Sequence, residues 1–484
     1  MGLELTEAYI DGLAPNAAAI KNARGLIQKR KLVQLNRTAD DTLLFGECAG
    51  SGKSNYVCSA DFIQPDKPVT RCSCPSRQFP CKHALAIMYA YAAGESFTVA
   101  EVPEDIASKR EKIEKREEKQ TQTAAQEQDP VKAAKKKATS KNALKKKVQA
   151  QLDGLDALEK LLLTLIRDGL GTIDAKTVKM INEQVKQMGN YYLTGAQNEL
   201  RRLALLLAEK NNREQHYTYI IAQMTRLHAL IQKGRRHLQA KLDDPELALD
   251  AESTIEEWLG HAWQLSELQE YGKMTEQAEL IQLSFISYDD PGRQEYIDLG
   301  YWMEMGTSHI YRTLQYRPYR AAKHLREEDS FMEIAAVPAL YRYPGDLNPR
   351  VRWDGMTTRA IKPEDIQKVR EQAQRSYADI VKQVKNQLKN PLADEHPAIV
   401  IHAAEICGIS SGGYAITDGS GQHMVLSTVG GVYPDTVQLL SFLPADQLRD
   451  VAVLGIFEHR MDTGELVLQP LSIVTNDTIV RLLY

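Results

Sequence analysis

Four residues near the N-terminus have the types and the spacing of a metal site: Cys72, Cys74, Cys81 and His83. They form a Cys-x-Cys pair that is followed, across a short loop, by Cys-x-His. Three thiolates and one imidazole complete the four-coordinate shell of a structural zinc ion, and soft sulfur and nitrogen ligands favour zinc over hard cations. A complete protein shell leaves no position for a water molecule. We therefore expect one structural Zn²⁺ that takes no part in catalysis.

Two other uses of these cysteines fit less well. A Cys-x-Cys pair is poorly placed to form a disulfide with itself, and a chain of 484 residues with six cysteines differs from small secreted disulfide scaffolds. An iron–sulfur cluster held by three cysteines and one histidine is the second alternative, but the small domains of that type leave a wider gap before the histidine. The other cysteines, Cys48, Cys58 and Cys407, fall on expected strands and are interpreted as small buried side chains.

The flanking segments predict elements that hold these residues. Pro75 ends any strand that carries the first cysteine pair, because proline has no N–H to donate. Residues 84–93 are rich in helix formers, so His83 is expected in the first turn of a helix that ends at Gly94. Upstream, the pattern predicts a helix at 15–29 and strands at 32–35, 42–45 and 56–59.

The two ligand pairs and these flanking elements resemble the SWIM zinc finger of bacterial proteins, a strand–strand–helix unit, over about residues 1–95. The resemblance implies a zinc ion held by the four residues named above. SWIM fingers occur in DNA-handling proteins and in protein-interaction settings. The arrangement of the whole chain is also similar to bacterial SWIM proteins that accompany MoxR-type AAA ATPases and von Willebrand A domain proteins, which implies a role as an adaptor.

The stretch from Gly46 to Ser54 superficially suggests a phosphate-binding loop. That motif needs a glycine five positions before its Gly-Lys-Ser, and Glu47 occupies this position. A strand, rather than the required helix, is expected at residues 55–59. We therefore interpret Gly50 to Gly52 as a hairpin turn.

Composition places the chain among soluble globular proteins, with 26% charged and 43% hydrophobic residues. No apolar run approaches the length that crosses a bilayer, and the N-terminus lacks the basic and apolar regions of an export signal. We expect a cytoplasmic protein without membrane contact.

A charged segment follows the finger. Residues 108–149 contain almost no aromatic or apolar β-branched core residues, and residues 130–150 contain lysines without any acidic residue. This composition predicts a linker that is partly helical when its ends are held. As an alternative to a solvated tether, its lysines are candidates for contact with nucleic acid: Lys132, Lys135, Lys136, Lys137, Lys141, Lys145, Lys146 and Lys147.

The rest of the chain divides by pattern. Leucines at spacings of three and four begin a series of helices, expected to end with one at 245–268, that form a bundle or a short α-solenoid. Short strands follow, with a single helix at 363–389. The fold class is multidomain α+β, with these parts: a zinc finger domain at 1–104, a Lys/Ala-rich linker at 105–150, a helical domain at 151–285 and a β-rich domain at 286–484.

Two further candidate sites lie in the β-rich region. Residues 311–320 interleave aromatic and basic side chains, as a surface that stacks single-stranded bases would, but a half-exposed strand shows the same alternation. Five polar residues could be arranged into a hydrolytic site, although nothing in their spacing requires it: His402, Glu405, His423, Glu458 and His459.

These observations favour a zinc-binding, non-enzymatic adaptor protein with protein partners. A nucleic-acid-binding protein that uses the finger and the lysine segment is the first alternative. A metal-dependent hydrolase in the C-terminal region is the second, and it would require a further metal ion.

Overall fold

The computed structural model describes residues 5–15, 17–49, 55–63, 68–74, 80–104, 106–108, 110, 130–209, 213–320, 329–410 and 412–483. The chain forms two compact units, residues 1–137 and 138–484. Among the described residues, no helix has the length and apolar character needed to cross a membrane.

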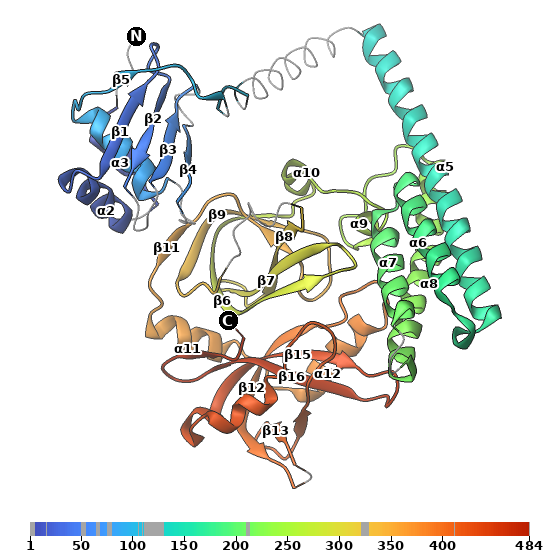
Figure 1. Ribbon diagram of the computed structural model, residues 1–484. Coiled ribbons are helices and arrows are strands. Elements are labelled where there is room, and N and C mark those ends of the chain that lie inside the picture. Colours follow the sequence, from blue (N-terminus) through green and yellow to red (C-terminus); the bar gives the residue numbers. More distant parts are fainter. Residues whose placement is uncertain are drawn as a thin grey trace. The chain divides into compact units, whose positions relative to one another are not determined.

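The first unit is a five-stranded sheet covered on one face by helices (Figure 1). Its core joins apolar side chains of the sheet to those of α2 and α3, including Leu44, Ala60 and Leu85. The expected helix and three strands upstream of the metal site are present, as is the helix that follows Cys81. The sheet order is β4-β3-β2-β1-β5, and the bounds are α1 (Glu7–Leu13), α2 (Ala17–Gln28), β1 (Leu32–Arg37), β2 (Leu43–Cys48), β3 (Tyr56–Asp61), β4 (Val69–Cys72), α3 (Lys82–Ala92) and β5 (Thr98–Val99).

Gly46 serves the sheet and does not open a phosphate-binding loop. It lies in β2, between Leu35 of β1 and Cys58 of β3. A Cβ atom at this position would lie 1.9 Å from the backbone oxygen of Gln34, so the strands can approach this closely only at a glycine. The next described element is β3, a strand, as expected; the turn expected at 50–52 lies outside the described residues.

A buried carboxylate ties the segment after the finger to the sheet. Asp61, at the end of β3, is 1% exposed. Its oxygens accept hydrogen bonds from Arg71 of β4 at 3.3 Å and from Arg110 at 2.8 Å. Because a buried charge is costly without a partner, this ion-pair cluster fixes Arg110 against the sheet.

The second unit begins with long packed helices, α5 (Pro130–Asp168), α6 (Ala175–Asn190), α7 (Thr194–Ala208) and α8 (Arg213–Asp243). The linker boundary expected at residue 150 falls inside α5. The apolar stripe of α5 starts earlier than the sequence suggested, because Val148 is already 2% exposed within the helical core.

The prediction of one helix at 245–268 is wrong. Only α9 (Ile255–Trp258) and α10 (Leu265–Glu270) form there. Two local features interrupt it: the Asp250 side chain accepts hydrogen bonds from the backbone of Glu252 and Ser253, and Gly260 adopts a φ of 85°. Such side-chain turns compete with helical hydrogen bonding.

Two β-sheets form most of the remainder of the second unit (Figure 1). The expected domain boundary at 285 falls inside β6. The first sheet contains β6 (Met274–Asp290), β7 (Glu295–Glu304), β8 (Ile310–Pro318), β9 (Ile334–Arg342), β10 (Val351–Arg352) and β11 (Thr357–Arg359); the second contains β12 (Ala398–Gly408), β13 (Tyr414–Thr417), β14 (His423–Leu426), β15 (Arg449–His459), β16 (Leu466–Val474) and β17 (Ile479–Arg481).

Both sheets close into five-stranded barrels with the same connections. Their strand orders are β8-β7-β6-β9-β10 and β14-β13-β12-β15-β16, so that the third strand comes first and the fifth comes last in each. A parallel bridge then joins the ends of each order, between Arg312 and Arg350 in the first barrel and between Leu426 and Leu468 in the second. The two barrels share a core in which β7 side chains such as Leu299 pack with Val400 of β12 and Leu454 of β15.

The helix expected at 363–389 is two helices, α11 (Pro363–Glu371) and α12 (Tyr377–Leu388). Gln374 lies between them and forms a bridge to Ile401 of β12. The Ser376 hydroxyl then caps α12 by accepting a hydrogen bond from the Asp379 backbone. Two 3₁₀ turns, η2 (Val437–Phe442) and η3 (Ala445–Leu448), precede β15.

Candidate metal centre

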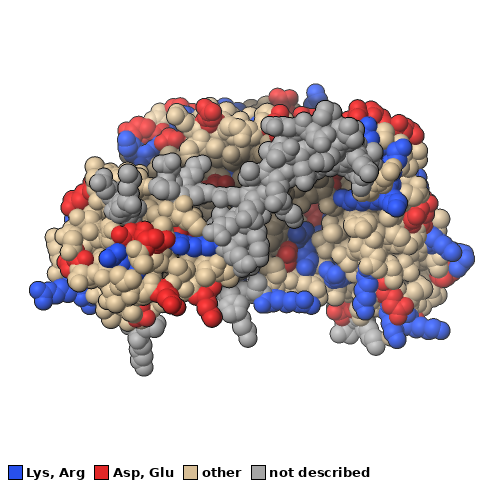
Figure 2. All heavy atoms as spheres, turned by 90° about the horizontal axis from the view of Figure 1, so that it is seen from above, with Lys and Arg blue, Asp and Glu red and all other residues tan. Residues whose placement is uncertain are grey.

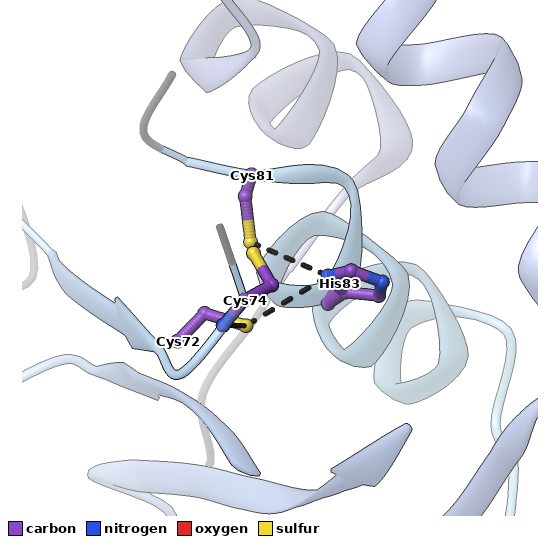
Figure 3. Close-up of side chains that lie close together, drawn as sticks. All are labelled: Cys72, Cys74, Cys81 and His83. Carbon is purple, nitrogen blue, oxygen red and sulfur yellow. Dashed lines mark hydrogen bonds between the residues drawn. The ribbon is translucent and has the colours of Figure 1, made fainter. Parts of the chain in front are cut away.

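The four predicted ligands come together where β4 meets α3 (Figure 3). Cys72 is the last residue of β4, and Cys74 follows in the turn. Cys81 is the residue before α3, and His83 lies in the first turn of that helix, as expected. The Leu85 N–H donates to the Cys81 carbonyl oxygen at 3.0 Å, which anchors this part of the site to the helix.

The donor atoms have the spacing of one tetrahedral site. All four lie within 4.8 Å of one another. The His83 Nδ1 atom is 3.8 Å from the Cys72 sulfur and 3.9 Å from the Cys81 sulfur. A tetrahedron with Zn–S of about 2.3 Å and Zn–N of about 2.0 Å has edges of roughly 3.5–3.8 Å, so the residues fit this ion with only a small contraction.

The protein surrounds the site closely. Cys74, Cys81 and His83 are buried, and Cys72 is partly exposed. The Cys74 backbone N–H donates to the Cys72 sulfur at 3.4 Å, an interaction that stabilises a thiolate. The Tyr56 ring lies 4.9 Å from the His83 ring and covers it on the side of β3.

Neighbouring thiols and burial raise the pKa of two of the cysteines. A hydrogen bond with Cys72, together with burial, raises the pKa of Cys81 to about 12. A hydrogen bond with Cys58, together with burial, raises the pKa of Cys72. Metal binding must therefore displace protons from sulfur, as expected for a site where a positive ion replaces several S–H groups.

Sequence reasoning missed one neighbour of the site. Cys58 is 1% exposed in β3, directly opposite Cys72 of β4. The sequence pattern indicated a strand at Cys58. It could not show which residue of the neighbouring strand lies opposite, because the pairing register depends on both strands.

The lysine candidates lie on helix α5. Lys145 and Lys146 are exposed, Lys147 is half-buried, and the Lys141 ammonium group pairs with Glu246 at 2.7 Å. The structure does not describe the side chains of Lys132, Lys135, Lys136 and Lys137. On the face of the molecule in Figure 2, basic and acidic side chains of the described residues are intermixed.

The interleaved segment 311–320 does not form a stacking surface along its strand. Tyr311 is 2% exposed, and its hydroxyl donates to Glu304. Arg312 pairs with Asp394, and Arg317 pairs with Asp298 at 2.7 Å. These aromatic and basic side chains therefore bind partners inside the protein. Only the end of the segment, at residues 318–320, is exposed.

The five polar residues considered for hydrolysis do not converge. His402 pairs with Asp450 at 3.0 Å, and Glu405 pairs with Arg449 at 3.1 Å. Glu458 lies 3.9 Å from another histidine, His396. Within the described ranges, the cysteine–histidine cluster is the one group whose atoms could hold a metal ion.

A pocket of about 570 Å³ between the barrels contains none of these five residues. Its walls come from the β7–β8 turn, the segment before β10, the α11–α12 connection and the start of β12.

One comparison with known proteins, the match to a family model, agrees with the geometry at the metal site. No curated protein and no solved structure matches the chain. Residues 56–92 match the family model described as SWIM zinc finger. This segment contains β3, β4, α3 and all four clustered residues. The N-terminal unit of this chain therefore carries a SWIM zinc finger with a metal-binding cluster of three cysteines and one histidine.

Proposed function

We propose that this chain is a zinc-stabilised, non-enzymatic adaptor protein. The observation that carries the proposal is the closed donor set, in which three sulfurs and one nitrogen converge on one point. Such a set holds zinc as a structural ion, with no position at which a substrate or a reactive water could bind. The metal then stabilises the finger, and the finger's surface is free to contact another macromolecule.

The proposed partners are proteins. The resemblance of the whole arrangement to bacterial SWIM proteins suggests MoxR-type AAA ATPases and von Willebrand A domain proteins. The second unit supports this assignment in a general way, because its helices and barrels present a large folded surface and the candidate hydrolytic residues of its second barrel do not converge.

Affinity purification of the full chain from its native host, followed by mass spectrometry of proteins and nucleic acids, tests this function. We expect specific protein partners at near-equal amounts. A Cys81→Ser variant should lose those partners that bind the finger and keep those that bind the second unit. Recovery of the chain alone, with zinc bound and the fold intact, would contradict an adaptor role.

Nucleic-acid binding is the second candidate, and exposed lysines on a regular helix favour it. Lys145 and Lys146 are adjacent on α5, where a rigid backbone positions their charges. The barrels favour it less. Their connection order is that of OB-fold barrels, which often bind oligonucleotides on the second and third strands. In the first barrel, β7 side chains on the outer face pack against the second barrel. In the second, β13 and β14 contain no lysine, arginine or tryptophan.

Binding measured at several salt concentrations separates the two candidates. A nucleic-acid-binding chain should lose affinity steeply as salt rises, and neutralising Lys145, Lys146 and Lys147 should flatten that dependence. Retention of neither DNA nor RNA at low salt would exclude this candidate and leave the adaptor proposal standing.

A further inference from the structure

Cys58 lies in contact with the metal site although it is not a member of the ligand set. It is opposite Cys72 in the antiparallel pairing of β3 and β4, so both side chains point to the same face of the sheet. Both cysteines belong to the same core cluster, in which Cys58 is buried and Cys72 is partly buried. The two residues are separated by a loop in sequence, and the sheet register alone brings them together.

The backbone geometry at this position suits a cross-strand disulfide. The Ser73 N–H donates to the Val57 oxygen at 2.9 Å, which makes the neighbouring pair a hydrogen-bonded one. Cys58 and Cys72 therefore form a non-hydrogen-bonded pair, in which Cα atoms lie roughly 4.5 Å apart. Disulfides span Cα distances of about 4.4–6.8 Å, so the bond requires little movement of either strand.

The two cysteines differ in exposure, so an oxidant reaches Cys72 before Cys58. Cys72 is the one ligand of the four that is partly exposed, so a small oxidant can reach it. Cys58 is 1% exposed and can react only with a neighbour. An accessible sulfur beside a shielded thiol is the arrangement of an oxidisable cysteine with its resolving partner.

We propose that Cys58 and Cys72 are a reversible disulfide site, through which peroxide releases the zinc ion. This inference rests on the proposed zinc-stabilised finger. The Cys72 thiolate attacks one oxygen of hydrogen peroxide, the O–O bond breaks, and hydroxide leaves with a proton as water. Cys72 becomes a sulfenic acid and no longer holds the ion. The Cys58 sulfur then attacks the Cys72 sulfur and displaces the hydroxyl group, which takes the Cys58 proton and leaves as a second water.

In sum, one thiolate, one thiol, one peroxide and one proton from solvent give one disulfide and two waters, with two electrons passing from sulfur to oxygen. A dithiol reductant reverses it, after which the four ligands can take up zinc again. Without Cys58, the sulfenic acid has no nearby non-ligand thiol on β3, and further peroxide carries it to sulfinic acid, which a dithiol does not reduce.

The test uses the full zinc-loaded chain, its Cys58→Ser variant and a Cys48→Ser control. Cys48 is also buried in this core, but it lies opposite Tyr56 rather than a ligand. After treatment with hydrogen peroxide, released zinc is followed with a chromogenic chelator and disulfides are mapped by mass spectrometry. Dithiothreitol and fresh zinc are then added, and rebound metal is measured.

We expect the wild type and the Cys48→Ser variant to form a Cys58–Cys72 disulfide and to recover most of their zinc. The Cys58→Ser variant should release zinc, accumulate sulfinic acid at Cys72 and fail to recover. Equal recovery by all three proteins, or disulfides that join two ligands in the wild type, would overturn the proposal. If Cys58→Ser does not bind zinc before oxidation, disulfide mapping in the wild type decides the question. A purified wild type that holds no zinc would instead refute the proposed zinc-stabilised function.

Discussion

At the scale of single residues, three cysteines and one histidine of the first unit form a cluster that could hold a metal ion. Cys81 is 1% exposed and lies between the metal site and the first turn of α3. Structural zinc contributes on the order of 10 kcal/mol to the folding of small zinc-binding units, which is comparable with the whole stability of many domains.

We therefore expect Cys81→Ser to abolish stoichiometric zinc binding and to unfold residues 1–104, while the second unit stays folded. Elemental analysis and calorimetry of the full chain check this, because the first unit's transition should disappear and that of residues 138–484 should remain. Cys407→Ser is the matched control: this cysteine lies in β12, outside the cluster, and its replacement should leave zinc content unchanged. Loss of all cooperative melting in Cys81→Ser would contradict the independence of the two units.

Glu256 provides a pH-dependent prediction in the second unit. It is 3% exposed; burial raises the pKa of its carboxyl group, but hydrogen bonds from His237 and Lys241 outweigh burial and lower the pKa to about 2. Because this folded-state pKa lies below the usual value of 4.5, the stabilisation is present above about pH 4.5 and is lost as the pH falls toward 2. Glu256→Gln should cost about 2–3 kcal/mol of unfolding free energy at pH 7.

The measurement for Glu256→Gln is urea unfolding at several pH values. The difference from wild type should shrink between about pH 4.5 and pH 2. Glu252→Gln is the control, since the Glu252 side chain is 85% exposed and pairs with Lys273. Such surface pairs contribute at most about 1 kcal/mol. A Glu256→Gln deficit that does not change with pH would show that packing, rather than charge, carries the effect.

Residue types and short spacings were enough to predict which four residues cluster as a possible metal site. Cys72, Cys74, Cys81 and His83 belong to two local pairs, and each pair states its chemistry without knowledge of the fold. Cys58 could not be assigned in the same way, because its role depends on which residue of β4 lies opposite it.

At the scale of elements, local sequence rules succeeded where an element obeys its own pattern. They failed at 245–268 because local turns interrupt the helix, and at 363–389 because a distant contact does. The helix expected at 363–389 has good helix formers and favourable ends. It breaks because Gln374 pairs with β12, a strand more than twenty residues later. In α5 the predicted linker proved to be part of a long helix. Its basic N-terminal half is helical, although the apolar residues that pack into the core begin only at Val148.

Gly46 gives the prediction at this scale. Gly46→Ala would place a methyl group 1.9 Å from the Gln34 backbone oxygen, where no flexible side chain can give way. We expect β1 and β2 to separate locally and the first unit to lose about 1–3 kcal/mol. Chemical denaturation of the zinc-loaded chain measures this.

Gly12→Ala is the control for Gly46→Ala. Gly12 lies in α1 with nothing within 4 Å of its added Cβ, and alanine favours helices, so stability should stay equal or rise. An unchanged stability in Gly46→Ala would mean that the β1–β2 approach relaxes without cost.

At the scale of the whole molecule, the helices and the two barrels belong to one compact unit. Arg202 of α7 binds Asp290 of β6 at 2.5 Å. Arg226 of α8 binds Glu395, just before β12, at the same distance. These contacts join parts that the sequence pattern had divided at residue 285.

A fragment of residues 138–484 should therefore fold, and a fragment of residues 286–484 should not. The second cut removes most of β6, the strand that pairs with both β7 and β9 in the first barrel. Circular dichroism melts and limited proteolysis distinguish the outcomes. A cooperative melt of residues 286–484 would restore the smaller domain that the sequence suggested.

The repeated barrel could not have been predicted from sequence periodicity. The two sets of strands share connections but not residue pattern, since β6 contains 17 residues and β12 contains 11. Closure also depends on isolated contacts between residues far apart in the chain, such as Arg312 with Arg350. Reasoning from single strands therefore predicted a β-rich region, but not the order of the strands in its sheets.

The distribution of tryptophan has a practical consequence. All four indoles, Trp258, Trp263, Trp302 and Trp353, belong to the second unit, and the unit that carries the cysteine–histidine cluster has none. Tryptophan fluorescence, excited near the red edge of protein absorbance, thus reports unfolding of the helices and barrels only. Far-ultraviolet signals follow the entire chain, so the difference between the two optical records isolates the finger without cutting or labelling it.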